Sequence, residues 1–360
     1  MTDRGAASGV QSVPGVPGVE DPDALARWMA GDGLAGLGEL RSVQLISGGR
    51  SNLTYRLDLD SGAIVLRRPP LGHVLPTAHD MNREYRVLSA LTGTAVPAPE
   101  PLAICSDTEV IGAPFYLMKN VDGVVLRTRQ DGEKLTPDQG AELSELLAQM
   151  LAAIHGVDFR AVGLADFGRP RGYLSRQLSR WQRQWELSNN REMPGYSELV
   201  ARLAAGLPDP DKAEGTLVHG DFRLDNTLVQ LTTPARIAAV VDWEMSTLGD
   251  PLADLGLTLS YWADDTGDQF PDINVGATVT GLPGFYSRAQ FAARYAELTG
   301  RDISSIGYYI AFGYFKLAVV LEGIHARYLL NQTVGEGFER EGPAVPLLIA
   351  RAHEMLDTAG

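Results

Sequence analysis

The feature that most constrains the fold of this chain is a change of sequence pattern near residue 121. Before it, short segments of alternating apolar and polar residues are separated by turn-forming residues, which is typical of β-strands. After it, apolar residues recur mainly at helical spacing. The sequence therefore predicts a bilobal α+β fold, with a small β-rich N-lobe containing one main helix (residues 21–121) and a larger, mainly helical C-lobe (residues 122–360).

The individual elements follow from local signals. In the large lobe, Thr136 followed by Pro137 and Gln139 is a typical helix start, and Gly156 marks the expected end of that helix. In the small lobe we expect strands at residues 43–46, 54–59, 63–67, 101–105 and 115–118, and helices at 23–30 and 80–91. In the large lobe we expect further helices at residues 173–186, 197–205, 251–262, 288–299, 306–330 and 344–358, and short strands at 216–218, 227–230 and 237–241.

Composition narrows the classes of function. Residues 1–20 are rich in Gly, Pro and small side chains, and we expect them to form a disordered tail. The net charge of −14 argues against nucleic acid as the main partner, and no apolar run approaches the length of a membrane span. The single cysteine, Cys105, cannot form an internal disulfide, which favours a cytoplasmic location. Composition does not predict the oligomeric state.

One segment combines residues with a specific chemistry. An expected strand ends at His219, and the loop after it presents Asp221 and, five residues later, Asn226. The next strand delivers Asp242. Phosphoryl transfer from ATP needs a carboxylate that orients the acceptor hydroxyl and takes its proton, together with an amide and a carboxylate that hold Mg²⁺. The joint spacing predicts a kinase-type site.

The run HGDFRLDN, followed by VVDWE, resembles the aminoglycoside phosphotransferase family, which is related to the protein kinases. Through SNLTYRL, VLRRPP and HGDFRLDN the chain is also similar to the kinase-like domains joined to acyl-CoA dehydrogenases. The resemblance covers roughly residues 40–330 and implies a protein-kinase-like fold, with ATP and Mg²⁺ as cofactors and a small-molecule hydroxyl as acceptor. It implies catalytic roles for Asp221 and Arg223, metal binding by Asn226 and Asp242, and a bracing role for Asp254 beneath the loop.

The same resemblance places the nucleotide on the small lobe. In the third strand Arg67 stands where protein kinases have a lysine, with Glu84 as its helix partner; Arg68 is the alternative if the register slips by one residue. The other residues that we expect to contact the nucleotide are the loop Ser47, Gly48, Gly49, Arg50, Ser51 and Asn52, and Met118 and Asn120 of the connection between the lobes.

The acceptor is suggested by a basic segment, residues 168–192. Arg176, Arg180 and Arg183 fall on one face of the expected helix, with Trp181 and Trp185 adding aromatic surface. This basic face favours an anionic acceptor over a polycationic aminoglycoside, and the resemblance to the kinase-like domains joined to acyl-CoA dehydrogenases implies an acceptor of the hydroxyacyl-CoA type. For the basic segment the alternative is a solvated helix that pairs with acidic neighbours. For the function the alternatives are an aminoglycoside-type antibiotic kinase and a pseudokinase-like module that binds a nucleotide or acyl ligand. A hydrolase using His219 and Asp221 lacks a GxSxG nucleophile elbow.

Overall fold

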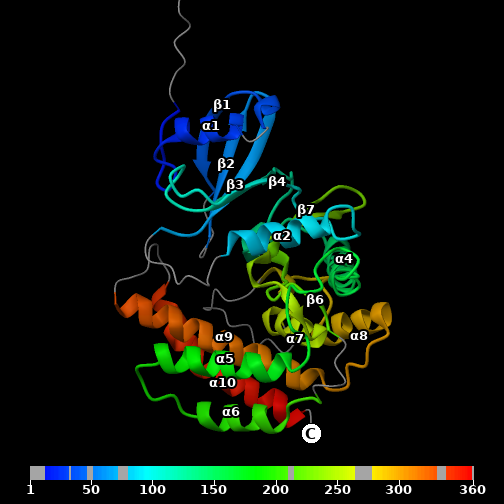
Figure 1. Ribbon diagram of the computed structural model, residues 1–360. Helices are drawn as coiled ribbons and strands as arrows, with labels where there is room; N and C mark the ends of the chain where they lie inside the picture. Colours follow the sequence, from blue (N-terminus) through cyan, green and yellow to red (C-terminus); the bar gives the residue numbers. More distant parts are fainter. Residues whose placement is uncertain are drawn as a thin grey trace, which may run out of the picture. The chain divides into compact units, whose positions relative to one another are not determined.

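The computed structural model describes residues 13–31, 34–46, 52–71, 80–209, 215–263, 278–330 and 338–358. The chain forms two compact units, and the boundary between Val121 and Asp122 falls where the sequence pattern changes (Figure 1). The smaller unit comprises Met1–Thr92 and Pro99–Val121, and the larger comprises Gly93–Ala98 and Asp122–Gly360. The α+β class expected from the sequence is confirmed.

The smaller unit is built on a five-stranded antiparallel sheet in the order β1-β2-β3-β5-β4. Strand β2 alternates buried and partly exposed residues, as the sequence predicts, whereas β3 and β5 contain runs of buried residues at the centre of the sheet. The strands are β1 (Leu40–Leu45), β2 (Leu53–Leu59), β3 (Gly62–Arg68), β4 (Pro101–Cys105) and β5 (Phe115–Lys119); the helices are α1 (Pro22–Gly31), the 3-10 turn η1 (Ala35–Leu37) and α2 (Met81–Leu91). The two helices expected in this unit, at residues 23–30 and 80–91, are thus present as α1 and α2.

The segment before α1 differs from the expected disordered tail. Val16 and Val19 bridge each other through their backbones, and the Val19 side chain is fully buried in the core beneath the sheet. The Tyr55 hydroxyl donates to the Pro17 carbonyl at 2.6 Å. The valines of the VPGVPGV run are apolar enough to bury, so residues 13–20 pack onto the sheet; the expectation for the rest of the tail falls on residues outside the described ranges.

Arg68, at the end of β3, also fastens this segment. The guanidinium is buried and donates to the carbonyls of Gly18 and Ile111, and also to that of Pro69 at 3.2 Å. A buried cation is tolerated here because polar acceptors replace the water it has lost.

The larger unit is mainly helical. Its α4 begins as the sequence predicts, with a capping box in which Thr136 and Gln139 bond reciprocally, and it ends before Gly156. The α-helices are α3 (Arg129–Gly132), α4 (Pro137–His155), α5 (Tyr173–Ser188), α6 (Tyr196–Ala205), α7 (Pro251–Tyr261), α8 (Arg288–Thr299), α9 (Ile306–Leu329) and α10 (Glu341–Thr358). The 3-10 turns are η2 (Leu224–Asn226), η3 (Trp243–Met245), η4 (Thr278–Gly281) and η5 (Phe338–Arg340).

The helix α9 is the core of this unit and packs against α7 and α10. Within the described ranges it is the helix whose length and mean hydropathy of 1.2 would allow it to cross a membrane, so the sequence does contain a run of that length. However, 72% of the apolar stretch is buried inside the protein, as expected for a core helix.

Two short antiparallel pairs frame the loop that follows His219. Strand β6 (Thr216–Val218) pairs with β9 (Thr247–Gly249), which the sequence did not predict, and β7 (Thr227–Gln230) pairs with β8 (Arg236–Val240). The loop leaves the end of β6 and enters β7 through η2. Both ends of this loop are therefore anchored in hydrogen-bonded strands.

We predict that Arg68→Met destabilises the smaller unit by about 2–4 kcal/mol, because the buried carbonyls of Gly18 and Ile111 lose their donor. The free energy of unfolding from chemical denaturation is the measurement. Arg41→Met is the matched control, since Arg41 lies in the same sheet but pairs with Asp60 and Glu39 at the surface, and we expect almost no change there. Equal stability of the two variants would contradict the structural role of Arg68.

Candidate active site

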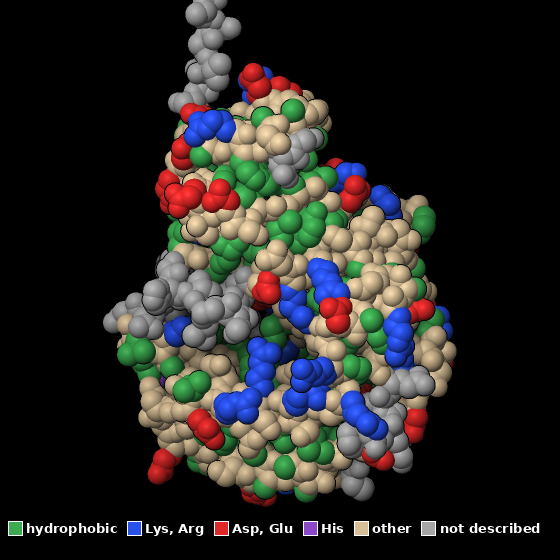
Figure 2. Space-filling model, viewed as in Figure 1, with side chains coloured by type: hydrophobic (Ala, Val, Ile, Leu, Met, Phe, Trp, Pro, Cys, Tyr) green, Lys and Arg blue, Asp and Glu red, His purple; other side chains and the backbone are tan. Residues whose placement is uncertain are grey.

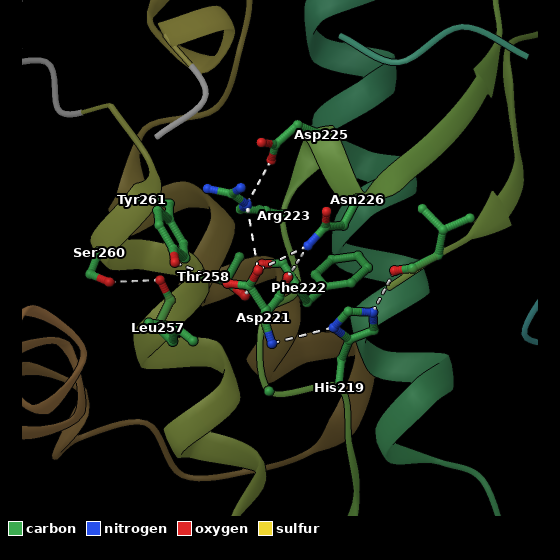
Figure 3. Close-up of polar contacts among 12 residues, drawn as sticks. His219, Asp221, Phe222, Arg223, Asp225, Asn226, Leu257, Thr258, Ser260 and Tyr261 are labelled. Carbon is green, nitrogen blue, oxygen red and sulfur yellow. Dashed lines mark hydrogen bonds and ion pairs between the residues drawn. The ribbon is translucent and has the colours of Figure 1, made fainter. Parts of the chain in front are cut away.

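The loop after β6 is held from below by helix α7. The Asp254 carboxylate accepts the backbone N–H of His219 at 2.7 Å through one oxygen and that of Gly220 at 2.9 Å through the other. One turn further along the helix, the Thr258 hydroxyl donates to the Phe222 carbonyl at 2.9 Å (Figure 3). The bracing position expected for Asp254 is therefore present, and α7 holds three peptide groups of the loop, two of them consecutive.

Asp254 is a buried carboxylate that stays ionised. Burial alone would raise its pKa, but the hydrogen bond from His155, the electrostatic interaction with the rings of His155 and His219, and the backbone N–H of His219 together hold the pKa below its usual value. His155 contacts Asp254 at 3.3 Å and the Tyr295 hydroxyl at 2.7 Å through its two ring nitrogens. His155 thus supports the carboxylate from the end of α4.

His219 is fixed in one tautomer by its contacts. Its Nε2 lies 3.0 Å from the Val241 carbonyl, which can only accept, so Nε2 carries the proton. Its Nδ1 then accepts the backbone N–H of Asp221 at 3.3 Å. Since both ring nitrogens bond to backbone groups, neither is free to act as a general base, which argues against the hydrolase alternative.

Gly220 is required by the turn that presents Asp221. Its φ is +83°, and a Cβ at this position would lie 2.6 Å from the Met245 carbonyl oxygen. Only glycine meets both conditions without strain. The HGD sequence is therefore needed for backbone geometry as well as for chemistry.

Both oxygens of the Asp221 carboxylate accept hydrogen bonds. The Asn226 side-chain amide donates to Oδ2 at 3.0 Å and to the Asp221 backbone carbonyl at 2.8 Å. The Tyr261 hydroxyl, at the last residue of α7, donates to Oδ1 at 2.9 Å (Figure 3). The carboxylate is thus held in one orientation while a quarter of its side chain stays exposed, at 25%.

Arg223 supplies the positive charge of this cluster. Its Nε lies 2.9 Å from an Asp225 carboxylate oxygen and 3.8 Å from Asp221 Oδ2, and its guanidinium stacks 4.7 Å from the centre of the Tyr261 ring. Burial opposes its charge, but Asp221, Tyr261, Asp225 and Asp242 outweigh this effect and raise the pKa of Arg223. Arg223 therefore remains a permanent cation beside Asp221.

Asp242 follows β8 in an unusual conformation. Its φ of 68° lies in the left-handed region, which costs a non-glycine residue about 1–2 kcal/mol. The preceding residue, Val241, is held by the loop on both sides, since its N–H donates to the Asn226 carbonyl at 2.9 Å and its own carbonyl accepts from His219. These bonds couple the position of Asp242 to that of Asn226.

The donor set fits a hard cation. Asn226 uses its amide nitrogen to hold Asp221, which leaves its carbonyl oxygen as the end that can bind a metal, and Asp242 adds a carboxylate. Among the described residues no three His, Cys, Asp or Glu side chains are grouped as a metal site. A site of one amide and one carboxylate suits Mg²⁺ that is held mainly by phosphate oxygens.

In the smaller unit, the structure pairs Arg67 with Glu84. The guanidinium lies 3.0 Å from the carboxylate of Glu84, which is 2% exposed, and contacts the Thr54 hydroxyl at 3.4 Å. Arg68 points instead to backbone carbonyls near the N-terminal segment. The strand register therefore makes Arg67, and not Arg68, the partner of Glu84, while contact of Arg67 with a nucleotide stays a prediction.

The other predicted nucleotide contacts are only partly described. Ser47, Gly48, Gly49, Arg50 and Ser51 lie outside the described residues. Asn52 is buried immediately before β2, Met118 pairs with Val65 in the sheet, and Asn120 follows the end of β5. The roles of all these residues in nucleotide binding stay predictions.

Two residues near Asp221 were missed by sequence reasoning. Tyr261 lies 40 positions from Asp221 and Lys316 lies on the apolar helix α9, so neither is adjacent to the motif. Lys316 Nζ donates to the Gly220 carbonyl at 2.7 Å and lies 5.5 Å from the Trp181 ring. The sequence did carry a signal for both residues. A lysine in the otherwise apolar α9, and polar residues along one face of the apolar α7, each need a hydrogen-bond partner when they are buried.

The basic face of α5 is only partly free. Figure 2 shows Lys and Arg side chains gathered on one face of the larger unit. The Arg176 guanidinium donates to the carbonyls of Arg169 and Arg171, so this side chain is bonded to the backbone of the segment that precedes α5. Arg180 is exposed, and its charge acts on Lys316 beside the Asp221 loop.

Comparison with known proteins identifies the family of the chain. The sequence model of a family described as "Phosphotransferase enzyme family" matches residues 42–287. Acyl-CoA dehydrogenase family member 11 of Gallus gallus is 37% identical over 87% of this chain and 40% of that protein. Acyl-CoA dehydrogenase family member 10 of Mus musculus is 34% identical over 89% of this chain and 30% of that protein. The chain thus spans two fifths or less of the length of these relatives.

Solved structures share the fold. A Ralstonia eutropha protein assigned as an aminoglycoside phosphotransferase is 34% identical, with a TM-score of 0.79 over 94% of this chain and 98% of its own. A ternary complex of aminoglycoside phosphotransferase APH(4)-Ia with AMP-PNP and hygromycin B is 16% identical, with a TM-score of 0.60 over 93% and 98% of the two chains. The protein-kinase-like fold and the family resemblance predicted from HGDFRLDN are both confirmed.

Proposed function

The chain belongs to the phosphotransferase enzyme family, and from this premise we propose that it transfers the γ-phosphoryl group of ATP to a hydroxyl of a small molecule. The observation that carries the proposal is the Asp221 carboxylate, which is bonded at both oxygens and presented by a loop that Asp254 anchors. Positioning and electrostatic stabilisation are what phosphoryl transfer requires of a protein.

Each residue of the cluster has a distinct task in this mechanism. Asp221 accepts a hydrogen bond from the acceptor hydroxyl, orients its oxygen toward the γ-phosphorus and takes its proton as the new O–P bond forms. The bond between the γ-phosphorus and the β–γ bridging oxygen breaks, and ADP leaves. Arg223, a permanent cation beside Asp221, offsets negative charge on the transferred group. Asn226 and Asp242 would hold Mg²⁺, which supplies neutralisation of the phosphate charge when it is bound with the nucleotide.

The nucleotide is proposed from two sources. Structures of proteins with this fold are described with AMP-PNP and with GDP. In the smaller unit the Arg67–Glu84 pair corresponds to the lysine–glutamate pair of protein kinases, and an arginine can bind phosphate oxygens bidentately. ATP is our proposed donor.

For the acceptor, we propose an anionic hydroxy compound of the hydroxyacyl-CoA type. Lys316 donates a hydrogen bond to the Gly220 carbonyl in the loop that carries Asp221. Asp221 and Arg180 both interact electrostatically with the Lys316 ammonium group. These cations fit phosphate or carbonyl oxygens better than the ammonium groups of an aminoglycoside. The acyl-CoA dehydrogenase relatives support the same choice.

The competing acceptor is an aminoglycoside, since related folds are described in complex with hygromycin B and kanamycin. Those proteins are 16% and 17% identical to this chain, a level that supports the shared fold alone. The pseudokinase alternative is opposed by the joint presence of Asp221, Asn226 and Asp242.

We predict that Asp221→Asn lowers kcat by about 10²–10⁴-fold while the nucleotide Kd stays within a factor of three, because Asp221 addresses the acceptor and not the nucleotide. Purified variant and wild type would be compared by ADP release and by nucleotide titration. Wild-type turnover by the variant would remove Asp221 from the mechanism.

We predict that Asp242→Ala abolishes the Mg²⁺ dependence of nucleotide binding and that Asn226→Ala weakens it, since each loses an oxygen ligand. Nucleotide titrations with and without Mg²⁺ give the two affinities. Asp225→Ala is the control, because Asp225 lies in the same loop but is paired with Arg223. A Mg²⁺ dependence that survives unchanged in Asp242→Ala would exclude it as a ligand.

We predict that hydroxyacyl-CoAs stimulate ADP release more than kanamycin does, and that Arg180→Ala raises the KM for the hydroxyacyl-CoA about tenfold, the effect of about 1.4 kcal/mol of lost charge interaction. Arg202→Ala is the control, because this arginine pairs with Asp357 of α10. Efficient phosphorylation of kanamycin that is insensitive to Arg180→Ala would defeat the anionic acceptor and leave the kinase proposal standing.

A further inference from the structure

The Tyr261 hydroxyl makes a direct contact with the Asp221 carboxylate, at 2.9 Å from Oδ1. Tyr261 stands outside the loop, at the last residue of α7. Figure 3 shows the ring reaching from the helix toward Asp221. The contact therefore joins the expected catalytic carboxylate to a separate, rigid element.

Tyr261 completes a stripe along α7. Asp254, Thr258 and Tyr261 are spaced four and three residues apart, so they share one helix face. Asp254 holds the backbone N–H groups of the loop and Thr258 holds a backbone carbonyl, whereas Tyr261 holds a side chain. The first two contacts fix where the loop lies, and the third acts on the reacting group itself.

The torsion of a carboxylate about its Cβ–Cγ bond is broad, so one hydrogen bond leaves its plane poorly defined. In Asp221 the Asn226 amide holds Oδ2 at 3.0 Å, and Tyr261 holds the other oxygen. Arg223 is more distant, at 3.8 Å from Oδ2. Removing the Tyr261 hydroxyl would leave Oδ1 without its hydrogen bond from α7, so the plane of the carboxylate would be set from the Oδ2 side alone.

Tyr261 is itself well fixed as a donor. The Arg223 guanidinium lies 4.7 Å from the centre of its ring, which restrains the ring plane. Burial and the charge of Asp221 raise its pKa well above the usual value, so the phenol keeps its proton. The bond to Asp221 is therefore donated by a neutral hydroxyl in a restrained position.

We infer that Tyr261 is a positioning residue for phosphoryl transfer, which orients the Asp221 carboxylate toward the acceptor hydroxyl. The inference rests on the proposed kinase function. During transfer the acceptor proton goes to Asp221, and Tyr261 keeps its own proton throughout. Its contribution is geometric, and it acts only through Asp221.

The test is Tyr261→Phe, which removes one oxygen and keeps the ring beneath Arg223. We expect kcat to fall about 10- to 100-fold, with the nucleotide Kd and the acceptor KM within a factor of three of wild type. Phosphoryl transfer would be measured as ADP release with a series of hydroxyacyl-CoAs and, without added acceptor, to water. Tyr309→Phe is the matched control, because its hydroxyl bonds to Asp250 at 2.8 Å in the same unit, and we expect its kcat to be unchanged.

A double-mutant cycle separates positioning from a general effect on the fold. In the Asp221→Asn background, Tyr261→Phe should cause no further loss of rate, because the group it orients is already disabled. A crystal structure of Tyr261→Phe should show the Asp221 carboxylate rotated or in two orientations. This crystal structure tests the inference independently of any measurement of turnover.

Three results would overturn the inference: a wild-type kcat in Tyr261→Phe, a further proportional loss in the Asp221→Asn background, or an Asp221 carboxylate that stays in place in the variant structure. Failure of the proposed function looks different. In that case Asp221→Asn itself would turn over like the wild type, or the wild type would transfer no phosphate to any of these acceptors.

Discussion

The site depends on one buried carboxylate, Asp254, which accepts the N–H groups of His219 and Gly220. Hydrogen bonds to a charged acceptor are worth about 1.5–3 kcal/mol each, and here two of them hold consecutive peptides at the point where the chain turns. The turn exists because Gly220 adopts a positive φ that other residues disfavour. The contact with Asp254 therefore sets the direction in which the chain enters the segment from Asp221 to Asn226.

The same loop organises the end of β8. His219 and Asn226 bond to the two backbone groups of Val241, so the left-handed residue Asp242 is placed by the loop that carries Asp221. Strain at such a residue persists only where its surroundings determine it. In the proposed mechanism, preorganisation of this kind lets the charges of Asp221, Arg223 and Asp242 act without rearrangement, which is the main contribution that a protein makes to phosphoryl transfer.

Much of the fold and site follows from local sequence. The Thr136–Gln139 capping box, the strand alternation and the HGDFRLDN spacing are short-range signals, and the structure has the corresponding elements. The pairing of Arg67 with Glu84 could also be predicted from the sequence, because strand alternation allows only one of two adjacent arginines to face Glu84. Asp221 and Asn226 are brought together by five residues of chain.

The features that escaped depend on distant packing. Tyr261 meets Asp221 only because α7 runs beneath the loop, and Lys316 meets Gly220 only because α9 packs against α7. Residues 13–20 looked disordered by composition, yet Val19 and the buried Arg68 fix them to the sheet. The net charge of −14 likewise hides the local excess of Arg and Lys on one face of the larger unit. Composition averages over the surface, whereas a site depends on particular neighbours.

The most direct test of the account is a crystal structure with AMP-PNP and Mg²⁺. We expect the ion to be bound by the Asn226 side-chain oxygen and the Asp242 carboxylate, with the γ-phosphate facing Asp221 and the Asn226 amide still on Asp221. A nucleotide bound elsewhere, or an ion that contacts neither Asn226 nor Asp242, would contradict the assignment of this loop as the phosphoryl-transfer site.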